Sequence, residues 1–113
     1  MPTTDFATFH AVWDTVLIRK TVFAWGSYVE RLEGAWLKSP EAVGADGGTP
    51  TSSALEAHKA AQAVWAAKPA NNILNDVYYQ VALPVLDRQL AVGGLRLTRF
   101  LNEAFAPQTC PVK

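Results

Sequence analysis

A histidine and an aspartate stand four residues apart near the start of the chain, in the stretch TFHAVWD. On a helix these positions, His10 and Asp14, lie one turn apart on the same face, with Cβ atoms about 5–6 Å apart. An imidazole nitrogen and a carboxylate oxygen placed in this way can both reach one zinc ion, at about 2.0–2.2 Å each. The same spacing suits a structural hydrogen bond between the two side chains, and taken alone it favours that simpler interpretation.

The rest of the chain adds little metal-binding chemistry. His58 is the only other histidine and Cys110 the only cysteine, so an intrachain disulfide and a CxxC-type zinc or redox site are excluded. Lys and Arg together number 10, as do Asp and Glu, which gives a formal net charge of zero. This balance argues against a protein that coats duplex DNA by neutralising phosphates. A nucleic-acid enzyme stays compatible with it, because a metal ion can carry the local positive charge.

The elements that must position these residues are all predicted to be helices, because no convincing two-residue period appears in the 113-residue chain. The first helix is expected to begin after Thr4 or Asp5 and to run to about residue 20. A second is expected over about residues 21–38 and ends before Pro40. A loop rich in Gly, Pro, Ser and Thr follows over residues 39–53.

Two further helices are predicted in the second half. Thr51, Ser52 or Ser53 is expected to cap an alanine-rich helix that runs to about residue 67. The last helix is expected to start near Asn75 or Asp76. Its apolar residues advance by three or four positions throughout, and this phase continues past Pro84 and the glycines at 93–94, which favours one long helix. These positions are Tyr79, Leu83, Leu86, Leu90, Gly94, Leu97, Leu101 and Phe105.

Membrane and export signals are not found in the sequence. No apolar run reaches the roughly 18 residues that a transmembrane helix needs. The first five residues, MPTTD, lack the basic and apolar regions of a signal peptide. The sequence therefore predicts no membrane partner.

Three blocks of sequence resemble the three-zinc, single-strand-specific nucleases (the nuclease S-one/P-one family). The block FHAVWDTVLI is similar to that family's Asn-Leu-His-x-Val-Trp-Asp-x-x-Leu-Ile stretch. The block SALEAHKAAQAVW resembles its helix with a Glu-Ser-His-like core, and DVYYQVALPVLDRQLAVGGLRLTRFLNEAF resembles its closing helix. The order and approximate spacing of the three blocks also fit the family.

The resemblance implies a fold, a metal and an activity. It implies an all-α helical bundle that forms an incomplete C-terminal part of the phospholipase C/nuclease-type zinc-binding fold. Its members hydrolyse phosphodiester bonds of single-stranded DNA and RNA through zinc-activated water, use up to three zinc ions, and are secreted or periplasmic. The first block's histidine and aspartate are zinc ligands there, so the resemblance assigns His10 and Asp14 as metal ligands. It assigns no metal to His58, which is expected to be a partly exposed packing or hydrogen-bonding residue. It assigns Arg96 an ion pair rather than a catalytic role.

Most of the family's metal ligands have no counterpart in the sequence, because they lie upstream of the first block. Residues 1–113 are therefore expected to form one domain, a C-terminal fragment of a zinc nuclease domain. At most one half-site for zinc remains, and no side chain matches a conventional nucleophile or general base. The chain alone is accordingly expected to be inactive, although the family consists of nucleases.

Two alternatives remain open. Zinc-dependent phospholipases C share the fold and metal cluster in outline, although the closing block favours the nucleases. The chain could instead be a non-catalytic helical module that binds a partner. Four tryptophans in so few helices also predict uncovered apolar surface, and hence self-association, a soft fold, or binding of a missing N-terminal segment.

Overall fold

The computed structural model describes residues 8–22 and 25–107, and every regular element in them is helical. A first helical stretch consists of α1 (Phe9–Ala11), a π-helical turn η1 (Val12–Val16) and α2 (Leu17–Thr21). It is followed by α3 (Trp25–Gly34) and two short 3₁₀ turns, η2 (Trp36–Lys38) and η3 (Pro40–Ala42). The two long helices are α4 (Pro50–Ala66) and α5 (Asp76–Ala104). The predicted all-α class is confirmed.

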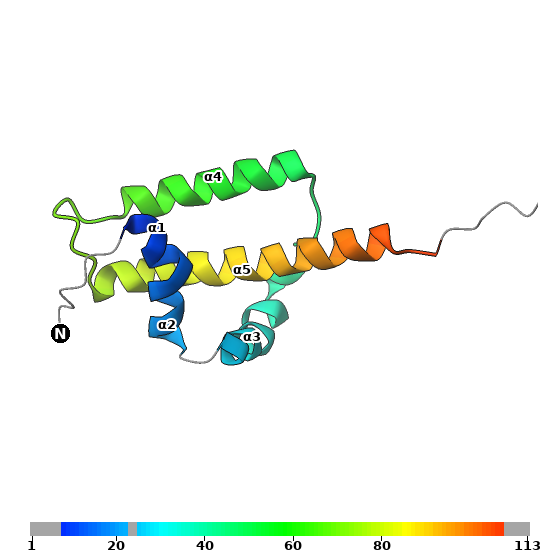
Figure 1. Ribbon diagram of the computed structural model, residues 1–113, viewed down its shortest axis with the longest axis horizontal. Coiled ribbons are helices and arrows are strands. Elements are labelled where there is room, and N and C mark those ends of the chain that lie inside the picture. Colours follow the sequence, from blue (N-terminus) through cyan, green and yellow to red (C-terminus); the bar gives the residue numbers. More distant parts are fainter. Residues whose placement is uncertain (1–7, 23–24, 108–113) are drawn as a thin grey trace, which may run out of the picture.

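The helix α5 is the axis of the molecule. It begins where the sequence predicts, with the Asn75 side chain accepting a hydrogen bond from the Tyr78 amide, and it continues through Pro84 and both glycines. In Figure 1 α4 and α3 lie on opposite sides of α5, the first helical stretch crosses its first half, and its last turns extend beyond these helices. The predicted single long helix is therefore confirmed.

Three other predicted boundaries need correction. The predicted helix over residues 21–38 is interrupted, because Val22 is extended and Ala35 leaves the helical conformation before η2. The cap of α4 is Thr49, rather than Thr51, Ser52 or Ser53. Thr49 and Ser52 form a reciprocal capping box, and Pro50 occupies the first turn, where a missing amide hydrogen costs nothing. The first helix, predicted to begin after Thr4 or Asp5, begins at Phe9, because Thr8 is extended and caps it, while Thr4 and Asp5 themselves lie outside the described residues.

The core lies where α2 and α3 meet the first half of α5. Leu17 and Tyr28 pack there against α5, and the half-buried side chains of Phe9 and Trp13 complete this cluster from the first helical stretch. The buried members from α5 are Tyr78, Ala82 and Leu86. This apolar contact holds the first helical stretch, and with it His10 and Asp14, against α5.

The hydroxyl of Tyr78 joins three parts of the chain. It lies on a side chain that is 3% exposed, accepts a hydrogen bond from the Trp13 indole at 3.1 Å and donates one to the Val64 carbonyl at 3.1 Å. Val64 is in the last turn of α4, where carbonyl groups lack a partner within the helix. Tyr78 thus satisfies a helix end while it anchors the π-helical turn.

We predict that Tyr78→Phe lowers the free energy of unfolding by about 1–3 kcal/mol, because it leaves the Trp13 N–H and the Val64 carbonyl without this partner. Tyr79→Phe is the matched control. The Tyr79 hydroxyl lies 2.9 Å from the Thr21 hydroxyl on a half-buried side chain, so both groups can turn to water. Urea unfolding of both variants would contradict this account if Tyr79→Phe cost as much as Tyr78→Phe.

A second prediction concerns alkaline pH. Burial, and then the hydrogen bond to the Asp87 carboxylate at 2.5 Å, raise the pKa of Tyr28 far above its ordinary 10.0, and burial also raises the pKa of Tyr78. Because these pKa values are raised in the folded state, their stabilising contribution is complete below pH 10 and is lost as the pH rises above it.

The free energy of unfolding should therefore fall steeply above about pH 10, and less steeply in Tyr28→Phe. Urea titrations between about pH 8 and 11 measure both slopes. An unchanged slope in Tyr28→Phe would show that Tyr28 ionises as readily in the folded chain as in the unfolded one.

Candidate metal centre

The two predicted metal ligands do lie together. His10 Nε2 is 2.7 Å from Asp14 Oδ2, so the four-residue spacing brings both side chains to the same side of the helix, as predicted. They stand in solvent, with side chains 86% and 62% exposed, so the prediction that a zinc half-site here would point into a cleft is wrong. In this structure the two side chains contact each other, which is also what a purely structural hydrogen bond between them would show.

The π-helical turn is the local feature that carries Asp14. The Thr8 hydroxyl accepts a hydrogen bond from the Ala11 amide and caps the helix just before His10. The Leu17 amide then donates to the Val12 carbonyl five residues back, so one turn is wider than an α-helical turn. Such turns often occur at functional sites. No pattern of residues in the sequence indicated this turn.

The aromatic side chains beneath the pair fix its place in the fold. Phe9 packs edge-on against Trp65 of α4, with ring centroids 5.1 Å apart, and against Tyr78, at 6.4 Å. Together with the Trp13 hydrogen bond, these contacts bind the buried side of the turn to α4 and α5. The opposite side therefore presents His10 and Asp14 to solvent from a fixed backbone.

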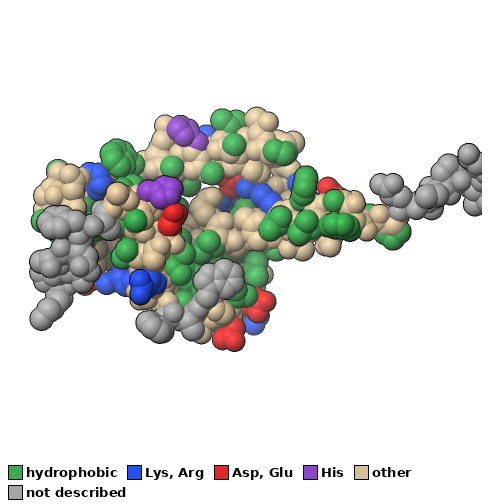
Figure 2. Space-filling view, in the orientation of Figure 1, with side chains coloured by type: hydrophobic (Ala, Val, Ile, Leu, Met, Phe, Trp, Pro, Cys, Tyr) green, Lys and Arg blue, Asp and Glu red, His purple; other side chains and the backbone are tan. Residues whose placement is uncertain are grey.

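No third metal ligand joins the pair within residues 8–22 and 25–107, where no group of three or more His, Cys, Asp or Glu side chains could hold a metal ion. His58 lies on the exposed surface of α4, and both histidines are solvent-exposed (Figure 2). The expectation that His58 packs only partly exposed is thus not met.

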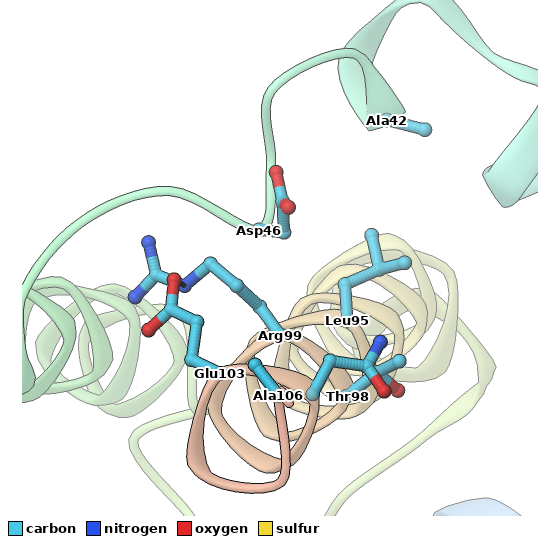
Figure 3. A pocket seen from close by; sticks show the side chains of 8 residues that line it. Ala42, Asp46, Leu95, Thr98, Arg99, Glu103 and Ala106 are labelled. Carbon is cyan, nitrogen blue, oxygen red and sulfur yellow. Dashed lines mark ion pairs between the residues drawn. The ribbon is translucent and has the colours of Figure 1, made fainter. Parts of the chain in front are cut away.

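Arginine side chains line both hollows of the surface. One hollow, shown in Figure 3, lies between the loop before α4 and the outer turns of α5, with Asp46 over Leu95, Arg99 and Glu103. Arg99 donates to the Gly48 carbonyl at 2.7 Å and holds that loop in place. The other hollow contains the Asp87 carboxylate, which Arg31 binds at 2.5 Å.

Arg96 has the structural role that the resemblance predicts. Its guanidinium donates to Glu56 Oε2 at 2.6 Å and to the Gly47 carbonyl at 3.2 Å, while Arg88 pairs with the other oxygen of Glu56. Hydrogen bonds from Arg96, and then from Arg88, hold the pKa of Glu56 below its ordinary 4.5. The predicted ion pair is confirmed, and it ties α4 to α5.

A model of the S1/P1 nuclease family matches residues 3–106, which is most of the chain. The chain therefore belongs to this family. Membership makes it a nuclease-type hydrolase in general terms. Neither the curated proteins nor the solved structures include a match to it. Among the described residues, no helix is both long and apolar enough to cross a membrane.

We predict that Glu56→Gln lowers the free energy of unfolding at neutral pH, by roughly 1–3 kcal/mol, because two arginines lose their anionic partner. The folded pKa of Glu56 is lowered, so its contribution is present above the unfolded pKa of 4.5 and is lost as the pH falls through the folded value. The difference between variant and wild type should therefore shrink below pH 4.5.

The matched control is Glu103→Gln. Glu103 is 68% exposed and its carboxylate lies 3.8 Å from Arg99 Nε, so its loss should change stability by less than about 0.5 kcal/mol. Chemical unfolding at pH 7 and pH 3.5 measures both variants. Equal effects of the two substitutions, or a Glu56→Gln effect that persists in acid, would contradict a structural role for this charge cluster.

Proposed function

We propose that this chain contributes His10 and Asp14 as zinc ligands to a nuclease that hydrolyses phosphodiester bonds in single-stranded DNA and RNA. The observation that carries the proposal is the convergence of an imidazole nitrogen and a carboxylate oxygen, 2.7 Å apart, in a chain that belongs to a nuclease family. The family model that matches is one of nucleases, which favours nucleic acid over phospholipid as the substrate.

The donor atoms of the pair suit zinc. Two donors that each lie about 2.1 Å from a tetrahedral zinc ion are roughly 3.4 Å apart. The His10 and Asp14 atoms are closer than that, at 2.7 Å, so the pair must open slightly. Both side chains are exposed and their backbone is held from below, so this adjustment requires only small rotations of the side chains.

Binding also requires the pair to exchange its hydrogen bond for the metal. In the hydrogen bond the imidazole donates its Nε2 proton to the carboxylate, whereas a metal ligand must offer that nitrogen's lone pair. His10 therefore has to carry its proton on Nδ1, and Asp14 has to act as an anionic ligand. Loss of the mutual hydrogen bond reduces the net gain, so the chain's affinity for zinc is modest.

The remaining ligands come, in this proposal, from polypeptide outside residues 8–22 and 25–107. Zinc sites in proteins use three or four protein ligands, and a pair alone leaves two or more positions to water. We treat residues 1–113 as one structural unit, the C-terminal part of a nuclease domain. Its activity then depends on the other ligands, and the unit alone does not cleave DNA.

Bound zinc would supply a Lewis acid that activates water and stabilises the charge that develops on the phosphate. The contribution of this chain is to position two ligands and to leave them accessible. By the same family membership, we propose that the enzyme works outside the cytoplasm, in a secreted or periplasmic form.

We predict that zinc raises the melting temperature of the chain by a small amount that saturates with the metal concentration, since binding to the folded state stabilises by RT ln(1 + [L]/Kd). His10→Ala and Asp14→Ala should each abolish that increase. His58→Ala is the matched control, because it removes the other exposed histidine and should leave the increase unchanged. Differential scanning fluorimetry with and without zinc measures all four proteins.

The activity assay separates the two parts of the proposal. The chain alone should release no fragments from single-stranded DNA. Cleavage should appear when an N-terminal segment with the other zinc ligands is added. Cleavage should then fail with His10→Ala. If His10→Ala and Asp14→Ala kept the zinc response, the metal would bind elsewhere. If zinc bound to the pair but complementation gave no cleavage, the chain would be a non-catalytic helical module.

A further inference from the structure

One apolar stripe runs along α5, and the chain's own helices cover only its first half. Leu86 and Tyr79 in that half pack against α2 and α3 in the core. From Leu90 onwards, side chains of the same stripe are uncovered: Leu97 is 58% exposed and Phe100 is 61% exposed. Figure 2 shows hydrophobic side chains gathered on this outer part of α5. The stripe thus continues beyond the helices that cover it.

This uncovered surface, which we call the outer face of α5, carries no charge. At 100° per residue it contains positions 90, 93, 94, 97, 100, 101, 104 and 105, all of them Leu, Gly, Phe or Ala. The charged residues of the same turns, Arg96 and Arg99 among them, lie on the other side of the helix and bind α4 and its preceding loop. The outer face is therefore free for another helix.

The order of large and small residues on the outer face complements itself. If a second copy of α5 packs antiparallel about a twofold axis at Leu97, each position faces the one whose number adds to 194. Leu90 then faces Ala104 of the other copy, and Leu97 faces its own equivalent. Gly93 faces Leu101 and Gly94 faces Phe100. Between Leu90 and Ala104, every large side chain away from the axis meets a small residue, as close helix packing requires.

The two glycines provide independent support. A Cβ atom at Gly93 or Gly94 would meet nothing within 4 Å in the monomer, so no contact within the described chain explains them. Two glycines in a helix interior cost roughly 1 kcal/mol each relative to alanine. A partner helix that inserts Phe100 and Leu101 above them would use the space that alanine would fill.

We propose that the outer face of α5 is the contact between two copies of this chain, packed as an antiparallel pair with its axis at Leu97. The exposed parts of its large side chains amount to on the order of 500 Å² per copy. If the other copy covers these side chains completely, two copies bury about 1,000 Å², the lower limit for a specific interface. The overlap ends at Leu90, close to where α3 binds α5 through Tyr28 and Asp87, so the partner helix fits the uncovered length.

Sedimentation velocity over about 5–500 µM tests the association. The wild type should shift from monomer to dimer over this range. Leu97→Glu should stay monomeric, because two carboxylates would meet at the axis, and Leu97→Asn should weaken the dimer at least tenfold without adding charge. The matched control is Leu55→Glu on α4, where Leu55 is 59% exposed and lies outside the outer face. A wild type that stays monomeric throughout, or equal effects of Leu97→Glu and Leu55→Glu, would overturn the proposal.

Cysteine cross-linking tests the axis itself. In a Cys110→Ser background, Leu97→Cys should form a disulfide-linked dimer on mild oxidation, because position 97 faces its own equivalent. Leu90→Cys should cross-link poorly, since the two copies of position 90 would be roughly 20 Å apart. Equal cross-linking at the two positions would overturn the antiparallel arrangement.

A substitution at Gly94 should change the stability of the monomer and the affinity of the dimer in opposite directions. Gly94→Ala should raise the melting temperature of dilute, monomeric protein, because alanine favours the helix and meets no neighbour. The same substitution should weaken the dimer severalfold, because the new methyl group occupies the place of Phe100 from the other copy. A Gly94→Ala dimer as tight as the wild type would contradict close packing at this position.

Discussion

The buried hydroxyl of Tyr78 is the contact on which the arrangement of the candidate metal centre depends. It binds the Trp13 indole on one side and the Val64 carbonyl on the other, and so connects the first helical stretch, the end of α4 and the start of α5. A hydroxyl can satisfy a donor and an acceptor at once, which neither phenylalanine nor leucine could do. Because burying an unpaired polar group is costly, these partners fix the depth and rotation of the π-helical turn. His10 and Asp14 are presented to solvent as a consequence.

Charge plays a complementary role on the other side of α5. Glu56 receives two arginines from α5, and Arg99 holds the loop before α4, so polar contacts rather than a deep apolar layer align α4 with the outer turns. The apolar cluster that includes α2 and α3 lies at the first half of α5, and Ala91 and Val92 are buried farther along the same helix. The first half of α5 therefore packs with α2 and α3, whereas the outer face of α5 is left open. The first helical stretch, which crosses the first half, carries the proposed zinc ligands, and the outer face is the proposed contact between copies.

The spacing of residues along the chain predicted those features that depend on helix geometry alone. The three-and-four spacing from Tyr79 to Phe105 predicted one long helix α5, whose start was expected near Asn75 or Asp76, and the four-residue spacing of His10 and Asp14 predicted their common side. The break between α3 and η2 was missed, because apolar spacing continues through Ala35 to Trp36 while the backbone there is not helical. Thr49 followed by Pro50 is a typical N-cap sequence, and the prediction missed it. The cleft predicted around His10 and Asp14 was wrong, because the exposure of these side chains depends on which other segments pack beside them.

The central claim is that zinc binds at His10 of α1 together with Asp14 of the π-helical turn. Long-range ¹H–¹⁵N NMR spectra of protein labelled at histidine, recorded during a zinc titration, test it most directly, because they report each imidazole nitrogen separately. The account predicts that zinc shifts Nε2 of His10 and leaves both nitrogens of His58 in place, and that Asp14→Ala removes the shift. Equal shifts of the two histidines, or a His10 signal that zinc does not move, would contradict it.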